Sequence, residues 1–524
     1  MRNLVRANLV SWPLRLPSPG TVVPSRRPGA SSAAPRRDLD RDHPRTAPAA
    51  DRTAMVFSTQ IFLFYFLPLA LLGNYLLPVR WRNLFLTLIS YVFYGWWNPW
   101  FVTLMALSSV IDWWAGAIIC APGASPRQRK AGLLFSLGAN LALLGYFKYA
   151  MFAQENWNRL VELFGGTPSP VVLITLPMGI SFYTFQTMSY SIDLYRGHAK
   201  RAKSFIDYIC FVSLFPQLVA GPIVRYQDVA DQLRSRPQKG ELFAAGALTF
   251  MCGFIKKVLL ANTVSQPADL CFDDAVALGT GAAWFGLVCF YFQLYFDFSG
   301  YSDMAIGLGK MFGFTFVENF ASPYKAGSFT EFWQRWHLSL TTFLRDYVFI
   351  PLGGSRGTKW QTARNTMITF LLGGLWHGAA WRYLIWGGAH GLMLVLERLS
   401  GKGCLWWFLP KVARTAVLVA IFQFNWIVFR CETLADGADY LDAMFGGRGN
   451  ATGQAVLAGQ VITPWYCFAL LLCAAVVFLG TETRQLVVRA ERSWRIALGL
   501  FAAFVVSVLA LFSQAENPFL YFRF

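Results

Sequence analysis

Charged residues are scarce in this chain of 524 residues. Asp, Glu, Lys and Arg make up only 14% of it, whereas 55% is hydrophobic and 17% is aromatic. A soluble protein of this length needs a larger charged fraction to cover its core. The composition therefore predicts a protein with many membrane-spanning segments and excludes an ordinary soluble enzyme.

Acidic residues are the scarcer of the two charges. The chain has 28 Asp and Glu against 46 Lys and Arg, which gives a formal net charge of +18. In a soluble chain this excess would suggest binding to nucleic acid. Here the basic residues gather in short segments between apolar runs, such as 196–203 and 484–495, as they do in the cytoplasmic loops of membrane proteins. The predicted partner is thus a lipid bilayer and not a nucleic acid.

The signatures of several soluble enzyme classes are missing. The nine cysteines form no C-x-x-C pair, and the chain contains neither H-E-x-x-H nor G-x-S-x-G. The segment from Gly307 to Lys310 resembles part of a phosphate loop, but Met311 stands where that loop needs Ser or Thr. We predict no metal site, no disulfide framework and no permanently bound cofactor.

Long apolar runs are absent from the first 54 residues. This segment holds ten arginines, four aspartates and eight prolines, and it cannot bury a core. We predict that residues 1–54 are disordered. Met55 then opens directly onto an apolar sequence and is a second candidate for the start of translation, which an N-terminal mass measurement would decide. Residues 55–524 are predicted to form one transmembrane domain.

Apolar runs follow one another from residue 60 onward, with short polar segments between them. We predict an all-α polytopic membrane protein with roughly 12 transmembrane helices and additional re-entrant helices around a central channel. A weaker run at 204–222 contains Pro216 and Pro222, which suits a broken re-entrant element buried in protein. The twelve stronger runs lie near 60–77, 84–97, 100–119, 131–150, 170–192, 241–262, 279–300, 364–380, 383–397, 406–428, 462–480 and 496–513.

Histidine is rare, with five copies in the chain. His43 lies in the predicted disordered tail and His198 in a basic loop, so a solvated role is expected for both. His377 stands between glycines within an apolar run. An ionisable group at membrane depth is costly and usually functional. His337 and His390 lie in the same third of the chain, so the three histidines are candidates for one site.

The surroundings of these histidines leave alternatives open. Aromatic residues at 329, 332, 333 and 336 follow helical spacing and predict an interfacial or re-entrant helix that carries His337 into the protein. The alternative is an aromatic belt at headgroup level. The glycines beside His377 indicate that something approaches the backbone closely, although a histidine bonded to a neighbouring helix is also compatible. His390 follows thirteen residues later and is predicted to be structural.

Several carboxylates lie in or beside the apolar runs. A buried carboxylate must pair with a partner or take up a proton. The acids are Asp112, Asp193, Asp297 and Asp303, and the candidate partners are Lys256, Lys257, Arg335 and Arg345.

A series of motifs in a specific order covers nearly all of residues 55–524. The motifs are MVFS (55–58), LPMGISFYTFQ (176–186), FPQLVAGP (215–222), YFDFSGYSDM (295–304), FWQRWHLSL (332–340), LRDY (344–347), IPLGG (350–354), GGLWHGA (373–379) and NPFLYFRF (517–524). Together they resemble the membrane-bound O-acyltransferase family, and specifically its bacterial branch typified by the membrane subunit of alginate O-acetylation.

The resemblance implies that His377 is the essential histidine of the family and that His337 is its second signature polar residue. It also implies an O-acetyltransferase of the bacterial inner membrane, which moves acetyl from a cytoplasmic donor, acetyl-CoA or another acetyl thioester, to a polysaccharide outside. The acceptor is alginate or a similar glycan. An extracytoplasmic partner acetyltransferase and the polysaccharide export machinery are the implied partners.

Acyl transfer from a thioester needs a base for the hydroxyl proton and a group that stabilises the oxyanion. We predict that His377 is the general base and that His337 orients or polarises the thioester carbonyl. The competing hypothesis is a proton-coupled secondary transporter that uses Asp and His as a proton relay. The lack of a clean internal repeat and the aromatic segment around His337 weigh against it.

Overall fold

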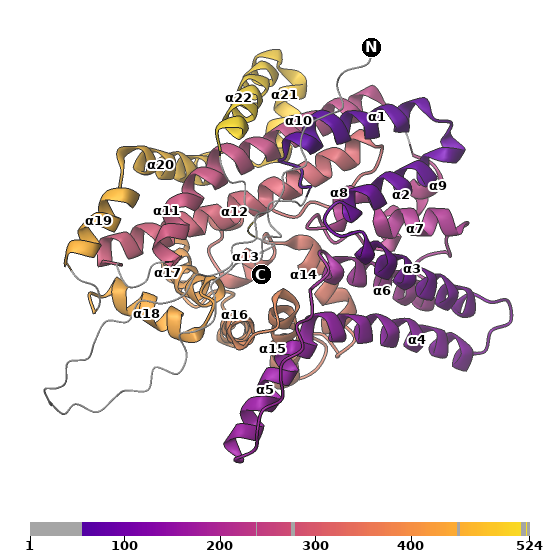
Figure 1. Ribbon diagram of the computed structural model, residues 1–524, viewed down its shortest axis with the longest axis horizontal. Helices are drawn as coiled ribbons and strands as arrows, with labels where there is room; N and C mark the ends of the chain where they lie inside the picture. Colours follow the sequence, from indigo (N-terminus) through magenta and orange to yellow (C-terminus); the bar gives the residue numbers. More distant parts are fainter. Residues whose placement is uncertain (1–54, 237, 274–277, 448–450, 515–519, 521–524) are drawn as a thin grey trace, which may run out of the picture. The chain divides into compact units, whose positions relative to one another are not determined.

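The computed structural model describes residues 55–236, 238–273, 278–447, 451–514 and 520. They belong to one compact unit, residues 50–524 (Figure 1). The regular structure in these ranges is helical, with no strand among them. The predicted disorder of residues 1–54 lies outside the described residues.

The helices are joined by short connections, and several are interrupted by π-helical or 3₁₀ turns, labelled η. The first half contains η2 (Phe62–Phe66), α1 (Leu67–Leu76), α2 (Val79–Gly95), α3 (Trp100–Ile119), α4 (Pro126–Leu144), η3 (Gly145–Tyr149), α5 (Ala150–Leu163), α6 (Ile180–Arg196), α7 (Phe205–Ser213), α8 (Phe215–Leu218), α9 (Tyr226–Arg234), α10 (Gly240–Ile255), η4 (Lys256–Ala261) and α11 (Asn262–Asp273). The second half contains α12 (Thr280–Met311), η5 (Pro323–Lys325), α13 (Phe329–Trp333), α14 (Leu338–Leu344), η6 (Arg345–Phe349), α15 (Lys359–His377), α16 (Trp381–Ser400), α17 (Lys411–Arg430), α18 (Leu434–Met444), α19 (Ala451–Val461), α20 (Pro464–Phe478), α21 (Thr483–Arg492) and α22 (Trp494–Ser513).

The predicted count of a dozen spans is not confirmed. Within the described ranges, five helices are long and apolar enough to cross a membrane, or six if α19 and α20, bent by 54°, form one span. Several of the other apolar runs form helices that are shorter or carry more polar residues. The 32-residue α12, for example, mixes tyrosines, carboxylates and small polar residues with its apolar ones and is almost entirely buried by other helices.

Helices α10 and α12 lie side by side (Figure 1), and glycines bring their backbones into contact. A Cβ atom added to Gly246 would lie 2.7 Å from the Gly307 carbonyl oxygen, and one added to Gly300 would lie 2.8 Å from the Gly253 carbonyl oxygen. The pairing runs in opposite chain directions, so the two helices are antiparallel. Small residues that bring backbones together are typical of helix packing in membranes.

Two of the predicted carboxylate–lysine pairs form along this same interface. Lys257 Nζ lies 2.6 Å from Asp297 Oδ1, and Lys256 Nζ lies 2.7 Å from Asp303 Oδ2. The prediction that the acids near apolar runs pair is confirmed for these two. Asp112 instead accepts hydrogen bonds from Ser136 and Asn140. It is satisfied by neutral donors of α4.

The predicted broken element at 204–222 is present. Helix α7 has nine residues and α8 has four, and the chain between Val219 and Pro222 is not helical. Nearly all of its residues from Tyr208 onward are buried. Non-helical backbone is tolerated in this way when protein, rather than lipid, surrounds it.

Candidate active site

His337 lies at a break between two short helices. It precedes α14 and follows α13, with φ +46° and ψ +53°, in the left-handed region. One other non-glycine residue within the described ranges, Ser322, has a positive φ. Backbone strain of this kind costs about 1–3 kcal/mol and collects at functional sites. The single helix predicted for this segment is two helices, since α13 ends at Trp333 and the strained His337 is the N-cap of α14.

The segment nevertheless carries His337 to the interior, as predicted. The imidazole is 1% exposed, and its ring packs nearly perpendicular to that of Phe298 with centroids 4.6 Å apart. The aromatic side chains of the segment are buried as well, Phe329 and Phe332 among them. The alternative of an aromatic belt at headgroup level therefore does not describe the segment that carries His337.

Asn319 determines the tautomer of His337. Its Oδ1 lies 3.0 Å from His337 Nδ1 and accepts a hydrogen bond from the backbone N–H of Ser339 at 3.2 Å. A backbone N–H only donates, so the atom it meets is the amide oxygen. Nδ1 of His337 must then carry a hydrogen, and the neutral ring presents Nε2 as an acceptor. That Nε2 is buried and has no hydrogen-bond partner in the described part of the chain.

We expect Asn319→Ala to reduce about 100-fold the acyl transfer that the resemblance implies, because the ring of His337 loses the contact that holds its orientation and tautomer. Acetyl ester on the exported polysaccharide, measured against the amount of protein in the membrane, checks this. Ser302→Ala is the matched control, because it removes only the bond from Asn319 Nδ2 at 3.0 Å. Wild-type transfer by Asn319→Ala would contradict the role of this contact.

His377 is the last residue of α15, and glycines let α16 approach it. A Cβ atom on Gly374 would collide with the carbonyl oxygen of Tyr383, and one on Gly378 would collide with the Tyr383 ring. The close approach predicted from these glycines is confirmed, and the approaching group is a neighbouring helix. The packing fixes the end of α15 and the position of His377.

Two tryptophans connect the three histidines. The ring of Trp376 has its centroid 6.0 Å from that of His337 and 5.1 Å from that of His377. Trp386 lies 5.1 Å from His377 and 4.7 Å from His390. The structure thus brings together the three histidines that were predicted to share one site.

His390 lies deeper than the other two, with no exposed surface and with aromatic rings on several sides. Neither ring nitrogen has a hydrogen-bond partner within the described residues. The structural role predicted for His390 stays a prediction.

A cavity of about 500 Å³ reaches His377. Trp333 and Trp386 line it beside the histidine, and Arg345 and Arg398 line it elsewhere. Trp386 and Arg398 are twelve residues apart on α16, which corresponds to about 18 Å along a helix. The cavity is thus long, and it runs from a histidine in the interior to exposed arginines at its rim.

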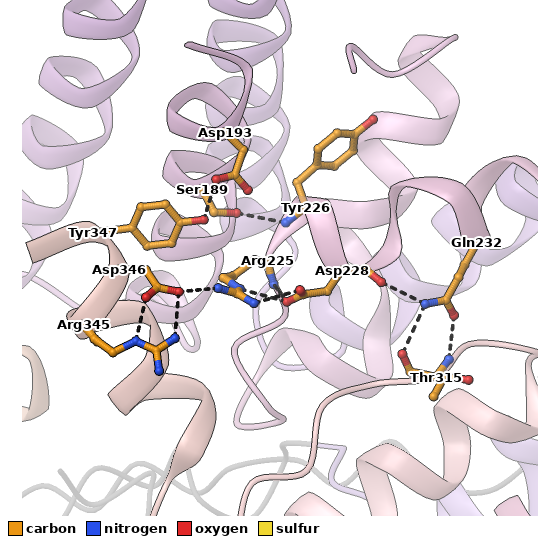
Figure 2. A network of polar contacts seen from close by, with 10 residues as sticks. All are labelled: Ser189, Asp193, Arg225, Tyr226, Asp228, Gln232, Thr315, Arg345, Asp346 and Tyr347. Carbon is orange, nitrogen blue, oxygen red and sulfur yellow. Dashed lines mark hydrogen bonds and ion pairs between the residues drawn. The ribbon is translucent and has the colours of Figure 1, made fainter. Parts of the chain in front are cut away.

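Arg345, which lines the cavity, belongs to a polar network (Figure 2). Arg345 Nε lies 2.7 Å from Asp346 Oδ1, and the other oxygen of that carboxylate accepts a hydrogen bond of 2.7 Å from Arg225. The hydroxyl of Tyr347 donates to Asp193 at 2.7 Å. These contacts tie the turn η6 to α6 and to the start of α9, so Arg345 is held at the rim.

Comparison with known proteins places the chain in a family. Residues 187–435 match the family model of MBOAT, the membrane-bound O-acyltransferase family. The chain is 41% identical to the "Probable alginate O-acetylase AlgI" of Pseudomonas aeruginosa, over 90% of this chain and 100% of that protein. It is 31% identical to the "Peptidoglycan O-acetyltransferase" of Helicobacter pylori, over 90% and 98%, and 27% identical to the "Teichoic acid D-alanyltransferase" of Bacillus subtilis, over 48% and 67%.

Apolar helices and a cavity that reaches an interior histidine are the features of a membrane-embedded enzyme. The chain belongs to the membrane-bound O-acyltransferase family, and its activity is O-acyl transfer.

Two polar residues of the site were missed by the sequence analysis. Lys148 contacts the end of α15, and a signal for it existed, because it is the one charged residue in the apolar run 131–150. Asn319 carried no such signal, because it lies in an irregular segment eighteen residues before the histidine that it contacts.

Proposed function

We propose that the protein transfers an acetyl group from a cytoplasmic acetyl thioester, with acetyl-CoA as the donor, to a hydroxyl of a polysaccharide outside the bacterial inner membrane. The transfer is direct or passes through an extracytoplasmic partner acetyltransferase. The observation that carries the proposal is the cavity, which joins an interior histidine to a basic rim.

The chemistry of the cavity suits a thioester with a long arm and an anionic head. Its inner walls are largely aromatic and aliphatic, whereas Arg345 and Arg398 stand at the rim. Arg398 is exposed and takes part in none of the ion pairs found in the described ranges. A guanidinium is well suited to phosphate. A CoA molecule would therefore place its phosphates at the rim and its thioester beside His377.

The reaction passes through a tetrahedral intermediate and needs one proton transfer when the intermediate forms and one when it breaks down. The acceptor oxygen attacks the thioester carbonyl carbon, and His377 takes the hydroxyl proton. The C–S bond then breaks, and the thiolate leaves and takes up a proton. Neutral imidazole is suited to this exchange near neutral pH.

The tautomer of His337 argues against both roles predicted for it, which were to orient or to polarise the thioester carbonyl. A group that polarises a carbonyl must donate a hydrogen bond. With Nδ1–H directed at Asn319, the neutral ring offers only an acceptor at Nε2. His337 is therefore proposed to orient the acceptor hydroxyl rather than to polarise the thioester.

The names of the relatives narrow the choice of acceptor polysaccharide. Two of them are named for acetyl transfer to a glycan, alginate in one case and peptidoglycan in the other, and the alginate enzyme is more similar to this chain. Alginate or a similar exopolysaccharide is accordingly the proposed acceptor. Polysaccharide export machinery would deliver it to the outer face of the membrane.

Deletion of the gene is expected to remove acetyl ester from one exported glycan, and the wild-type gene is expected to restore it. Hydrolysis of the purified glycans, followed by identification of the sugar that loses acetate, names the acceptor. An unchanged acetyl content in every exported glycan would overturn the proposal. Proton-coupled solute uptake into proteoliposomes without acyl transfer would instead support the secondary transporter.

A further inference from the structure

Lys148 is a lysine in an unusual place. It lies near the middle of the 38-residue helical stretch Pro126–Leu163, which is long and apolar enough to cross a membrane. A charged residue in a membrane-spanning helix is costly and usually has a functional partner. Lysines near the ends of apolar runs can extend to the interface, but the ammonium of Lys148 turns to the end of α15 instead.

A π-helical turn, η3, occupies this point of the helix. It spans Gly145–Tyr149 and separates α4 from α5. Such turns insert an extra residue into a helix and are frequent at functional sites. Here the last two residues of the turn, Lys148 and Tyr149, both direct their side chains to the end of α15.

The two side chains bind consecutive carbonyl groups just before His377. The hydroxyl of Tyr149 donates to the Leu375 carbonyl at 2.7 Å, and the ammonium of Lys148 donates to the Trp376 carbonyl. The last carbonyls of a helix lack partners within the helix. A cation at this end also opposes the negative pole of the helix dipole.

The remaining contacts of Lys148 are neutral. Its Nζ donates to Ser181 Oγ at 3.0 Å and lies 5.8 Å from the centre of the Trp376 ring. No ion pair among the residues that the structure describes includes it. Burial of an ammonium beside a hydroxyl and a carbonyl, without a carboxylate, costs desolvation free energy, and a neutral donor could hold the helix end without that cost. Ordinary packing does not require it.

We propose that Lys148 is a positioning residue of the active site, whose ammonium holds the last turn of α15 so that His377 presents its imidazole to the cavity. The inference rests on the proposed role of His377. Trp376, whose carbonyl Lys148 binds, also lies against His337. The same contact therefore sets the relative positions of both histidines.

The test compares Lys148→Met with Lys148→Arg. Methionine has a similar length and fills the space without a charge or a donor, whereas arginine keeps both. We expect Lys148→Met to lower polysaccharide acetylation about 100-fold per protein molecule, because a base that is displaced by about 1 Å loses rate on that scale. Lys148→Arg is expected to restore a large part of it. The purified variants should bind CoA with the affinity of the wild type, and their thermal midpoints should lie within a few degrees of the wild-type value.

Lys130→Met is the matched control, since it makes the same exchange in the same helical stretch at an exposed position. If Lys148→Met does not accumulate, Lys148→Gln takes its place as the uncharged variant. Glutamine keeps a donor for the Trp376 carbonyl, and the acetylation by this variant is compared with that by Lys148→Arg in the same way. Wild-type acetylation by the uncharged variant, or equal loss in Lys148→Met and Lys148→Arg, overturns the proposal. If His377→Ala also acetylates normally, it is the proposed function that fails.

Discussion

Replacement of His377 by alanine is expected to abolish polysaccharide acetylation, with a loss of about 100- to 10,000-fold in the rate of transfer. The imidazole lies at the inner end of the cavity and is the group that we propose to take the proton of the acceptor hydroxyl. The glycines that admit α16 are unchanged, so the helix pair should remain assembled. Acetyl ester per unit of exopolysaccharide in a complemented deletion strain measures the effect.

The matched control is His198→Ala, because His198 is an exposed histidine of a basic loop. It should acetylate as the wild type does at equal protein level. A His337→Ala/His377→Ala double variant should lose little more than His377→Ala alone if the two residues act in the same step, since such effects are not additive. Retained acetylation by His377→Ala would remove the histidine from the mechanism and leave the fold unaffected.

Gly253→Leu is expected to destabilise the protein by about 3 kcal/mol or more. A Cβ atom at this position would lie 2.6 Å from the backbone nitrogen of Met304, and backbone on α12 cannot move aside as a side chain can. The two helices would separate, and the Lys256–Asp303 pair beside them would be strained or broken. A lower thermal midpoint in detergent and loss of the monodisperse peak on size exclusion are the expected observations.

The control for this substitution is Gly499→Leu on α22, where an added Cβ would meet nothing within 4 Å. Both variants add the same apolar side chain to a membrane helix, so they differ only in the position of the leucine. Equal stability of the two proteins would show that α10 and α12 are not in backbone contact.

The sequence was sufficient to select much of the candidate site. Ionisable residues in apolar runs are so costly that His337, His377 and the Lys–Asp pairs could be selected one by one. The glycines around His377 indicated a close backbone contact for a similar reason, because glycine in a helix is otherwise unfavourable. These predictions depend on the immediate surroundings of each residue.

Other features depend on contacts between distant parts of the chain. Lys148 and the Trp376 carbonyl are 228 residues apart, and nothing in either segment specifies the other. The left-handed conformation of His337 interrupts a regular aromatic pattern that otherwise favours one continuous helix. The predicted number of spans is not confirmed, since an apolar run that other helices surround looks the same in sequence as one that faces lipid.

The backbone at His337 also constrains how the enzyme can change by mutation. A φ of +46° is tolerated by glycine, asparagine, aspartate and histidine far better than by branched or bulky residues. Of these, asparagine alone can replace the imidazole with a neutral side chain that both donates and accepts hydrogen bonds. Asparagine is therefore the one uncharged replacement among these residues that keeps both kinds of hydrogen bond. A homologous enzyme that lacks histidine here should carry asparagine more often than any other residue.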